Sequence, residues 1–168
     1  MLKVLVPVNG SENAHRTVQH LLRMHRDKEP MEVHLLNVQS PFPRYISRFL
    51  SRDQIVSHHL ERGAEALRRA ITPLEAAGIP CRHHSEIGDK ATAITRFAKR
   101  QRCDLIVMGT SRKSSFSRFL GDSVTNQVME LAEVPVKIIP GEQATKLEKF
   151  GIPACLGLGL TIWYLADE

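Results

Sequence analysis

The sequence predicts an α/β fold, an open, doubly wound, five-stranded parallel sheet flanked by helices. Short apolar runs rich in β-branched residues alternate along the chain with amphipathic segments of helical period. The runs lack a clean alternation of apolar and polar side chains, as is typical of strands that are covered on both faces. Strands that alternate with helices favour right-handed βαβ crossovers and therefore parallel strands in one open sheet.

Each of the five predicted strands is bounded by turn or loop residues. The strands are residues 4–8, 33–38, 81–87, 105–108 and 134–139. The run at 81–87 carries the weakest strand signal, and it follows a turn at Gly78-Ile79-Pro80.

Four amphipathic segments are expected as helices between these strands. Their apolar stripes span residues 14–22, 60–74, 91–98 and 124–132. Residues 39–52 contain two prolines and no clear periodicity, so they are predicted to be a loop. The basic run from Arg96 to Arg102 is interpreted as the exposed end of a helix, where cations complement the helix dipole.

The chain is expected to hold one α/β domain over residues 1–140, followed by a linker and an apolar tail over 141–168. Residues 141–149 are polar, whereas 152–165 are apolar almost throughout and include the only tryptophan. This apolar segment is shorter than the ~20 residues that a bilayer-spanning helix needs. We therefore expect it to pack on its own domain or on a second subunit, not to enter a membrane.

The amino-acid composition indicates which classes of partner the protein can bind and in which cellular compartment it lies. The net charge of +5 favours anionic partners, while an aromatic content of only 5% argues against a stacking platform for single-stranded nucleic acid. The three widely spaced cysteines fit reduced thiols better than a disulfide framework, and the first residues form no signal peptide. We therefore expect a cytoplasmic protein.

The residues best placed for chemistry lie at the carboxyl ends of the first and fourth strands, where doubly wound sheets bind ligands. The first of these strands ends at Asn9-Gly10-Ser11. The fourth leads into a loop over 109–123 that is rich in glycine and serine and ends at a helix beginning near Ser123. Backbone amides in such a loop can cradle phosphates. From the composition of the loop alone, a flexible, solvated, basic loop is an equally good interpretation.

Several segments resemble the universal stress protein family in the right order. They are the opening Val4-Leu-Val-Pro-Val-Asn-Gly-Ser11, the stretch 88–94, the stretch 103–110, Ser123-Val124 and the run 134–139. The resemblance extends over residues 2–140. It implies a Rossmann-like fold of the adenine nucleotide alpha hydrolase kind, with a switch-point pocket for ATP or AMP.

The resemblance also implies which residues bind the nucleotide, and it assigns no catalytic residue and no metal ligand. Pro7, Asn9 and Val38 would line the base and the sugar. Met108, Gly109, Ser111 and Arg112 would follow the sugar and the phosphates, with Ser123 and Val124 at the start of the helix.

This chain departs from the pattern of the ATP-binding members at three positions. Asn9 stands where the family usually has Asp, and Arg112 and Asp122 occupy two glycine positions. Our leading hypothesis is a stress-response protein that binds an adenine nucleotide or a related anion. One alternative is an interaction protein without a nucleotide, in which Arg112 and Asp122 close the pocket. Another is a slow ATP hydrolase or phosphotransferase, with Asp122 the only acidic residue of the loop.

A homodimer is expected, because the run 134–139 would form an edge strand open to pairing with its twin. The apolar tail would extend this interface.

Other candidate sites have weaker support. The pairs His58-His59 and His83-His84 are not spaced as helical metal ligands and are expected at the surface. Cys103 is interpreted as a small core residue. The sequence contains no nucleophile elbow and no complete P-loop motif.

Overall fold

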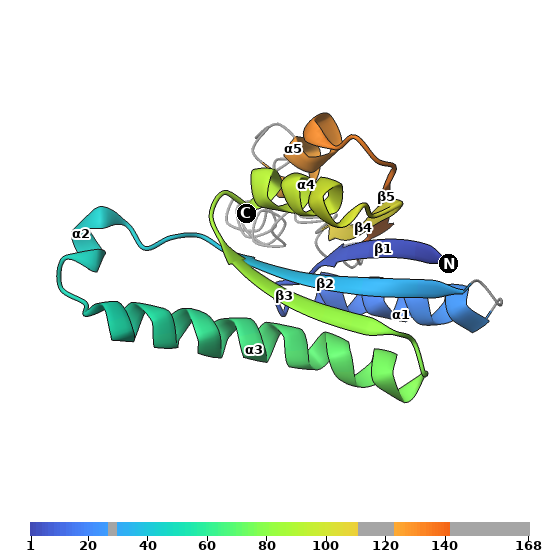
Figure 1. Ribbon diagram of the computed structural model, residues 1–168, viewed down its shortest axis with the longest axis horizontal. Helices are drawn as coiled ribbons and strands as arrows, with labels where there is room; N and C mark the ends of the chain where they lie inside the picture. Colours follow the sequence, from blue (N-terminus) through green and yellow to red (C-terminus); the bar gives the residue numbers. More distant parts are fainter. Residues whose placement is uncertain (27–29, 111–122, 142–168) are drawn as a thin grey trace, which may run out of the picture.

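The computed structural model describes residues 1–26, 30–110 and 123–141, and its five strands form one parallel sheet (Figure 1). The spatial order of the strands is β3-β2-β1-β4-β5. Their bounds are β1 Leu2–Pro7, β2 Met31–Gln39, β3 Cys81–Ile87, β4 Leu105–Thr110 and β5 Val136–Pro140. The predicted fold class is therefore confirmed. The predicted linker and tail from residue 142 onward lie outside the described residues.

Helices cover both faces of the sheet. Helices α1 (Glu12–Arg26) and α3 (Arg52–Ala76) lie on one face, and α4 (Lys90–Gln101) and α5 (Val124–Leu131) lie on the other (Figure 1). Strand β1 contributes to both cores, because Val4 and Val6 pack in the cluster with α1 and α3, while Leu5 packs with α4. Burial on both faces explains why the strand has no alternation of apolar and polar residues.

The strand order reverses between β1 and β4. From β1 the chain proceeds through α1 to β2 on one side, and it later returns through α4 to β4 on the other side. Six residues of β1, Leu2 to Pro7, pair with β2, but only Val4 and Leu5 pair with β4. The last two residues of β1, Val6 and Pro7, are therefore not paired with β4, as expected for the crevice of a doubly wound sheet.

The segment predicted to be a loop at 39–52 contains a short helix, α2 (Arg44–Ser47), and α3 begins at Arg52, well before the predicted stripe. The start of α3 is fixed by a capping box. The Gln54 amide donates to Ser51 Oγ over 3.1 Å, and the Ser51 amide donates to Gln54 Oε1 over 2.8 Å. We call residues 40–60 the arm, because α2 and the first turns of α3 project beyond the carboxyl edge of the sheet (Figure 1).

The expectation that the histidine pairs lie at the surface is wrong for one member of each pair. His59 is buried, and His84 is half-buried with its ring stacked on the buried His34, at a centroid distance of 5.4 Å. His58 and His83 are exposed, as expected. Cys103 is buried in the second core, which agrees with its prediction as a core residue.

The basic run at the end of α4 forms ion pairs in addition to complementing the helix dipole. Lys99 and Arg100 lie in the last turn, as expected. Arg100 also pairs with Glu86 on β3 over 2.5 Å, and Arg96 pairs with the same carboxylate over 3.3 Å. These contacts tie α4 to the edge strand β3.

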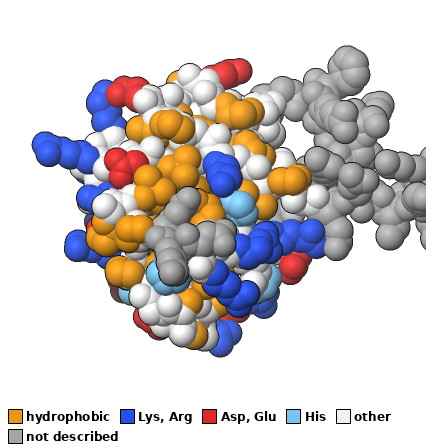
Figure 2. All heavy atoms as spheres, turned by 90° about the vertical axis from the view of Figure 1, so that its right-hand side faces the viewer, with side chains coloured by type: hydrophobic (Ala, Val, Ile, Leu, Met, Phe, Trp, Pro, Cys, Tyr) orange, Lys and Arg blue, Asp and Glu red, His pale blue; other side chains and the backbone are white. Residues whose placement is uncertain are grey.

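Charged side chains are mixed on the face at the amino edge of the sheet. Figure 2 shows Lys and Arg on both sides of hydrophobic side chains, with Asp and Glu among them. In the part of the chain that the structure describes, no helix is both long and apolar enough to cross a membrane.

Candidate functional site

The turn after β1 is built around Asn9, Gly10 and Ser11. Gly10 has a φ of +73°, a conformation that glycine adopts at little cost. The Ser11 amide donates to Asn9 Oδ1 over 3.1 Å, and the Ala14 amide donates to Ser11 Oγ over 3.4 Å at the start of α1. The Asn9 side chain is exposed at the mouth of the crevice. Its side-chain oxygen is thus used by the turn, which leaves the side-chain nitrogen as the donor that Asn9 can offer.

Gly109 lies at the end of β4, directly under the first turn of α1. A Cβ atom placed on Gly109 would lie 2.4 Å from the backbone oxygen of Asn13. No side chain tolerates such a distance to a backbone atom, so this position requires glycine for packing. The predicted ligand-binding glycine therefore has a structural reason of its own.

Helix α5 presents its amino-terminal end at the same edge of the sheet. Ser123 is the N-cap residue, and its side-chain oxygen accepts from the Asn126 amide over 3.1 Å. The first turn of α5 contains no acidic residue, so the partial positive charge of the helix end is not neutralised from within the helix. Because Ser123 supplies the cap, the helix does not need the Asp122 carboxylate at this position. Asp122 itself lies outside the described residues.

Of the residues implied for the base and the sugar, Val38 and Met108 are core residues. Both are buried in the cluster that α4 and α5 cover, whereas Pro7 is half-buried at the end of β1. Val124 is half-buried against the same cluster. Ser111 and Arg112 lie outside the described residues, so the predicted phosphate contacts there remain predictions.

A buried polar network that was not predicted from the sequence lies at this edge of the sheet. Asn37 Nδ2 donates to the Val8 carbonyl over 2.8 Å, and Gln39 Nε2 donates to Asn37 Oδ1 over 3.0 Å. Gln39 Nε2 also donates to the His59 carbonyl over 2.7 Å, and His59 Nδ1 lies 2.8 Å from Gln39 Oε1. Because an amide oxygen can only accept, His59 Nδ1 donates the hydrogen in the bond to Gln39 Oε1. The network links the end of β1 to the arm through β2.

A cavity of about 280 Å³ lies beside the turn after β1, on the face that α1 and α3 cover. Its lining residues are Val8, Gly10, Ser11, Glu12, Ala14, His15, Ala66, Arg69 and Ala70. It shares only the β1–α1 turn with the predicted nucleotide site, because Val38, Met108 and Ser123 do not line it.

Two aspartates in the segments that carry the family resemblance have structural roles. Asp89 is the N-cap of α4, and hydrogen bonds from Thr92 hold the pKa of this carboxyl below its usual range. Asp104 accepts a hydrogen bond from the Lys3 amide over 2.8 Å, which ties the start of β4 to β1. Within residues 1–26, 30–110 and 123–141, no three His, Cys, Asp or Glu side chains gather as a metal site.

Comparison with known proteins decides the family. The model of the universal stress protein family matches residues 1–140. This chain belongs to the universal stress protein family. A universal stress protein of Methanocaldococcus jannaschii is 29% identical over 140 residues, which cover 82% of this chain and 81% of the relative. One from Methanothermobacter thermautotrophicus is 28% identical over 140 residues, covering 82% of this chain and 94% of the relative.

Solved structures of the family share the fold. A family protein from Burkholderia pseudomallei has a TM-score of 0.65 at 23% identity, covering 83% of this chain and 96% of that chain. An Arabidopsis thaliana family protein with AMP bound has a TM-score of 0.63 at 22% identity, covering 84% and 93%. The universal stress protein from Archaeoglobus fulgidus in complex with dAMP has a TM-score of 0.60 at 20% identity, covering 83% and 98%.

Proposed function

We propose that this universal stress protein is a stress-response protein that binds an adenine nucleotide, ATP or AMP, or a related anion at the switch point. The observation that carries the proposal is the amino-terminal end of α5, which has no acidic residue in its first turn and whose Val124 packs against the cluster that contains Val38 and Met108. Anions are stabilised at such helix ends by free amides and by the helix dipole. The relatives that were crystallised with AMP and dAMP support this choice of ligand.

In this proposal several of the predicted residues have a defined role. The exposed amide nitrogen of Asn9 would donate to the sugar or the base, since its oxygen is held by the Ser11 amide. The first amides of α5, after the cap at Ser123, would donate to a phosphate. Ser111 and Arg112 would extend these contacts, with Arg112 replacing backbone donors by a charge-assisted bond. Val38 and Met108 would support the site from the core.

Calorimetric titration with AMP, ATP and adenosine tests the proposal. The Asn126→Asp variant adds a carboxylate to the first turn of α5, where it stabilises the helix but repels a phosphate. A like-charge repulsion of about 1 kcal/mol in water weakens AMP binding roughly fivefold. Binding of uncharged adenosine and the Asn126→Ala control should change far less. Absence of heat with AMP, ADP and ATP on the unmodified protein would falsify the proposal.

We also propose that the protein is a homodimer that pairs through β5. This strand lies at the end of the sheet, hydrogen-bonded to β4 on one side only. An open strand edge is a template for pairing with a second chain. Sedimentation velocity over a range of concentrations should show a species of twice the chain mass of 18.9 kDa. A single species of chain mass at all concentrations would contradict this assembly.

A cytoplasmic location remains our proposal. It is supported by the free thiols of Cys81 and Cys103, because reducing compartments keep cysteines in this state.

A further inference from the structure

We propose that the arm, residues 40–60, is the docking site of the chain's own apolar segment 152–165. The described part of the chain leaves hydrophobic side chains of the arm uncovered, and this segment of the same chain would cover them. The contact does not depend on nucleotide binding.

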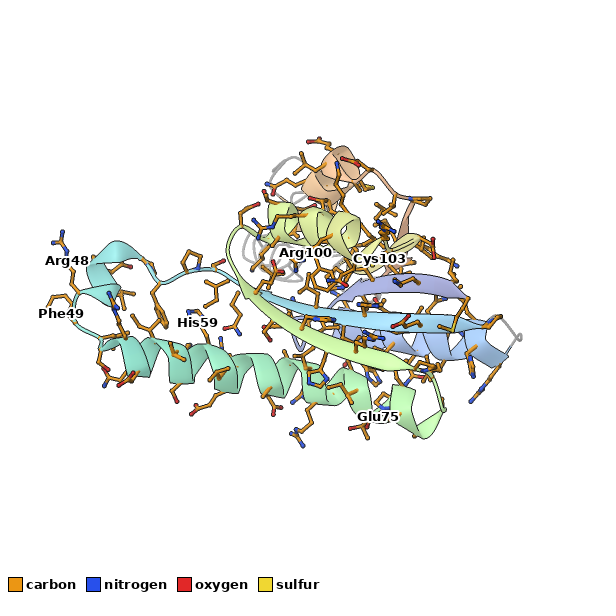
Figure 3. The ribbon with its side chains drawn as sticks, in the orientation of Figure 1. Arg48, Phe49, His59, Glu75, Arg100 and Cys103 are labelled. Atoms are coloured by element: carbon orange, nitrogen blue, oxygen red, sulfur yellow. The ribbon has the colours of Figure 1, made fainter. Side chains whose placement is uncertain are left out.

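Exposed hydrophobic side chains concentrate on the arm. In the part of the chain that the structure describes, four of the eight large exposed hydrophobic residues, Tyr45, Phe49, Val56 and Leu60, belong to it. Phe49, at the far end of the arm, is 86% exposed (Figure 3). Ile87 is also exposed, and the bond from the Gly88 amide to the Gln39 carbonyl, 2.9 Å long, places it at the root of the arm. Exposed hydrophobic side chains that gather on one segment are typical of an interaction site.

The uncovered residues of α3 continue the stripe that the helix buries against the sheet. Val56 precedes Leu74 by five helical turns and Leu60 precedes Leu67 by about two turns, so each pair lies on one side of the helix. Leu74 and Leu67 are 0% and 4% exposed, whereas Val56 and Leu60 are 53% and 66% exposed.

The difference arises because the sheet ends at the level of Gly63. A Cβ atom on Gly63 would lie 3.0 Å from Ser85 Oγ and 3.1 Å from Gln39 Nε2, so this residue contacts the ends of β2 and β3. Val56 and Leu60 lie beyond that level. The apolar stripe of α3 is thus longer than the surface that covers it.

The arm is a preformed surface, because its own contacts hold it in place. His59 lies between α3 and the chain that leaves β2 (Figure 3), bonded to Gln39 at both its ring and its carbonyl. The Phe42 ring packs on His58 and His59 at centroid distances of 5.2 and 5.1 Å. A segment that docks here would therefore not have to order the arm first.

The apolar segment 152–165 fits this surface in chemistry. It contains no charged residue, and it is followed by Asp167 and Glu168. The arm carries two exposed cationic residues, Arg48 and Arg52, in addition to its exposed hydrophobic residues. The apolar segment and its acidic end therefore complement the apolar surface of the arm and its two arginines.

The segment also begins close enough to reach the arm. The Gly141 amide donates to the Thr110 carbonyl over 2.9 Å, so the chain leaves β5 at the same carboxyl edge from which the arm projects. From β5 to β2 is three strand spacings, about 14 Å, and Val56 lies about 10 Å beyond Gly63 along α3. The ten residues 142–151 can span roughly 33 Å, which exceeds the combined distance.

Disulfide trapping with the natural Cys155 tests the contact and distinguishes one chain from two. The Leu60→Cys variant places a thiol on the uncovered stripe, and Glu61→Cys, one residue later, places it on the outward side of the same helix. Under mild oxidation of the full chain, Leu60→Cys should form an intrachain disulfide with Cys155 several-fold faster than Glu61→Cys. Adding Cys155→Ser should abolish it. A covalent dimer would mean that a second copy supplies the segment, and equal rates would mean that the segment lies elsewhere. Either result overturns the proposal.

The single tryptophan, Trp163, gives an independent readout without new cysteines. The double variant Val56→Asp and Leu60→Asp should shift Trp163 emission to longer wavelength and increase its quenching by acrylamide. Because both residues are exposed, the domain should keep its circular dichroism spectrum. Met129→Asp, an exposed residue of α5, is the matched control. The proposal fails if only the control changes the emission, or if neither variant does.

Discussion

At the scale of single residues, Gly109 is both a predicted ligand contact and a position that packing restricts to glycine. The family resemblance assigns this glycine to the approach of a ligand. The structure gives a nearer cause, since the first turn of α1 lies against the backbone of β4 at Asn13. Loss of nucleotide binding in a bulky Gly109 variant would therefore not by itself show a contact with the ligand.

Gly109→Ala should destabilise the domain in the absence of any nucleotide. The added Cβ would lie 2.4 Å from the Asn13 oxygen, so α1 has to move away from β4. Overpacking of this kind costs about 1–3 kcal/mol. The measurement is the free energy of unfolding in urea, with Gly88→Ala as the control because nothing lies within 4 Å of its added Cβ. Equal stability of the two variants would show that α1 adjusts without cost.

The contacts of several polar residues could not be predicted from the sequence, because their partners come from distant parts of the chain. Asn37 and Gln39 stand in or next to a strand run, where the sequence gives no sign that they bond Val8 and His59. The same holds for His34, whose ring is covered by His84 and Phe97 from two other elements. The periodicity of apolar residues predicts which face of an element a residue occupies. It does not predict which polar group will be its hydrogen-bond partner.

At the scale of elements, apolar periodicity located every described strand and the cores of the four long helices. It failed at the start of α3, where Arg52, Asp53 and Gln54 form a polar first turn. The better signal there was Ser51 with Gln54 three residues later, the pattern of a capping box. It also failed at α2, a four-residue helix that is too short to have a period. Strand β5 begins at Val136 instead of 134, after Pro135, which has no amide hydrogen for a ladder bond.

At the scale of the whole molecule, alternation of strand and helix predicted a doubly wound sheet, and the structure confirms it. The position of the expected ligand crevice follows from this topology, because the chain runs from β1 to β2 on one side of β1 and later returns to β4 on the other side. The loop over 111–122 was predicted to complete the site, and it lies outside the described residues. The fold was therefore more predictable than the site, because the fold depends on patterns repeated along the chain and the site on individual contacts.

The packing of the whole domain also predicts how its stability depends on pH. Burial, above all, lowers the pKa values of His34 and His84 below the ordinary value of 6.5, and it does the same for His20. Glu32 Oε1 lies 3.4 Å from His34 Nε2 and opposes the shift, but Lys3 and Arg82 act with burial. Arg100, Arg82 and the neighbouring histidines act in the same direction on His84. Burial is the largest of these influences, so the pKa of His34 stays below its ordinary value although Glu32 is near.

The sign of the effect follows from proton linkage. Near pH 6.5 the unfolded chain binds protons at these histidines more readily than the folded domain does, so the free energy of unfolding rises with pH there. Stability should be complete above the unfolded pKa and should fall as the pH drops below about 6.5 toward the lower folded values. Urea unfolding from about pH 8 to about pH 5 measures this slope. His84→Phe keeps a ring against Phe97 but cannot titrate, so its slope should be shallower than that of the exposed control His58→Phe. A domain that becomes more stable on acidification in this range would show that Glu32, not burial, controls the pair.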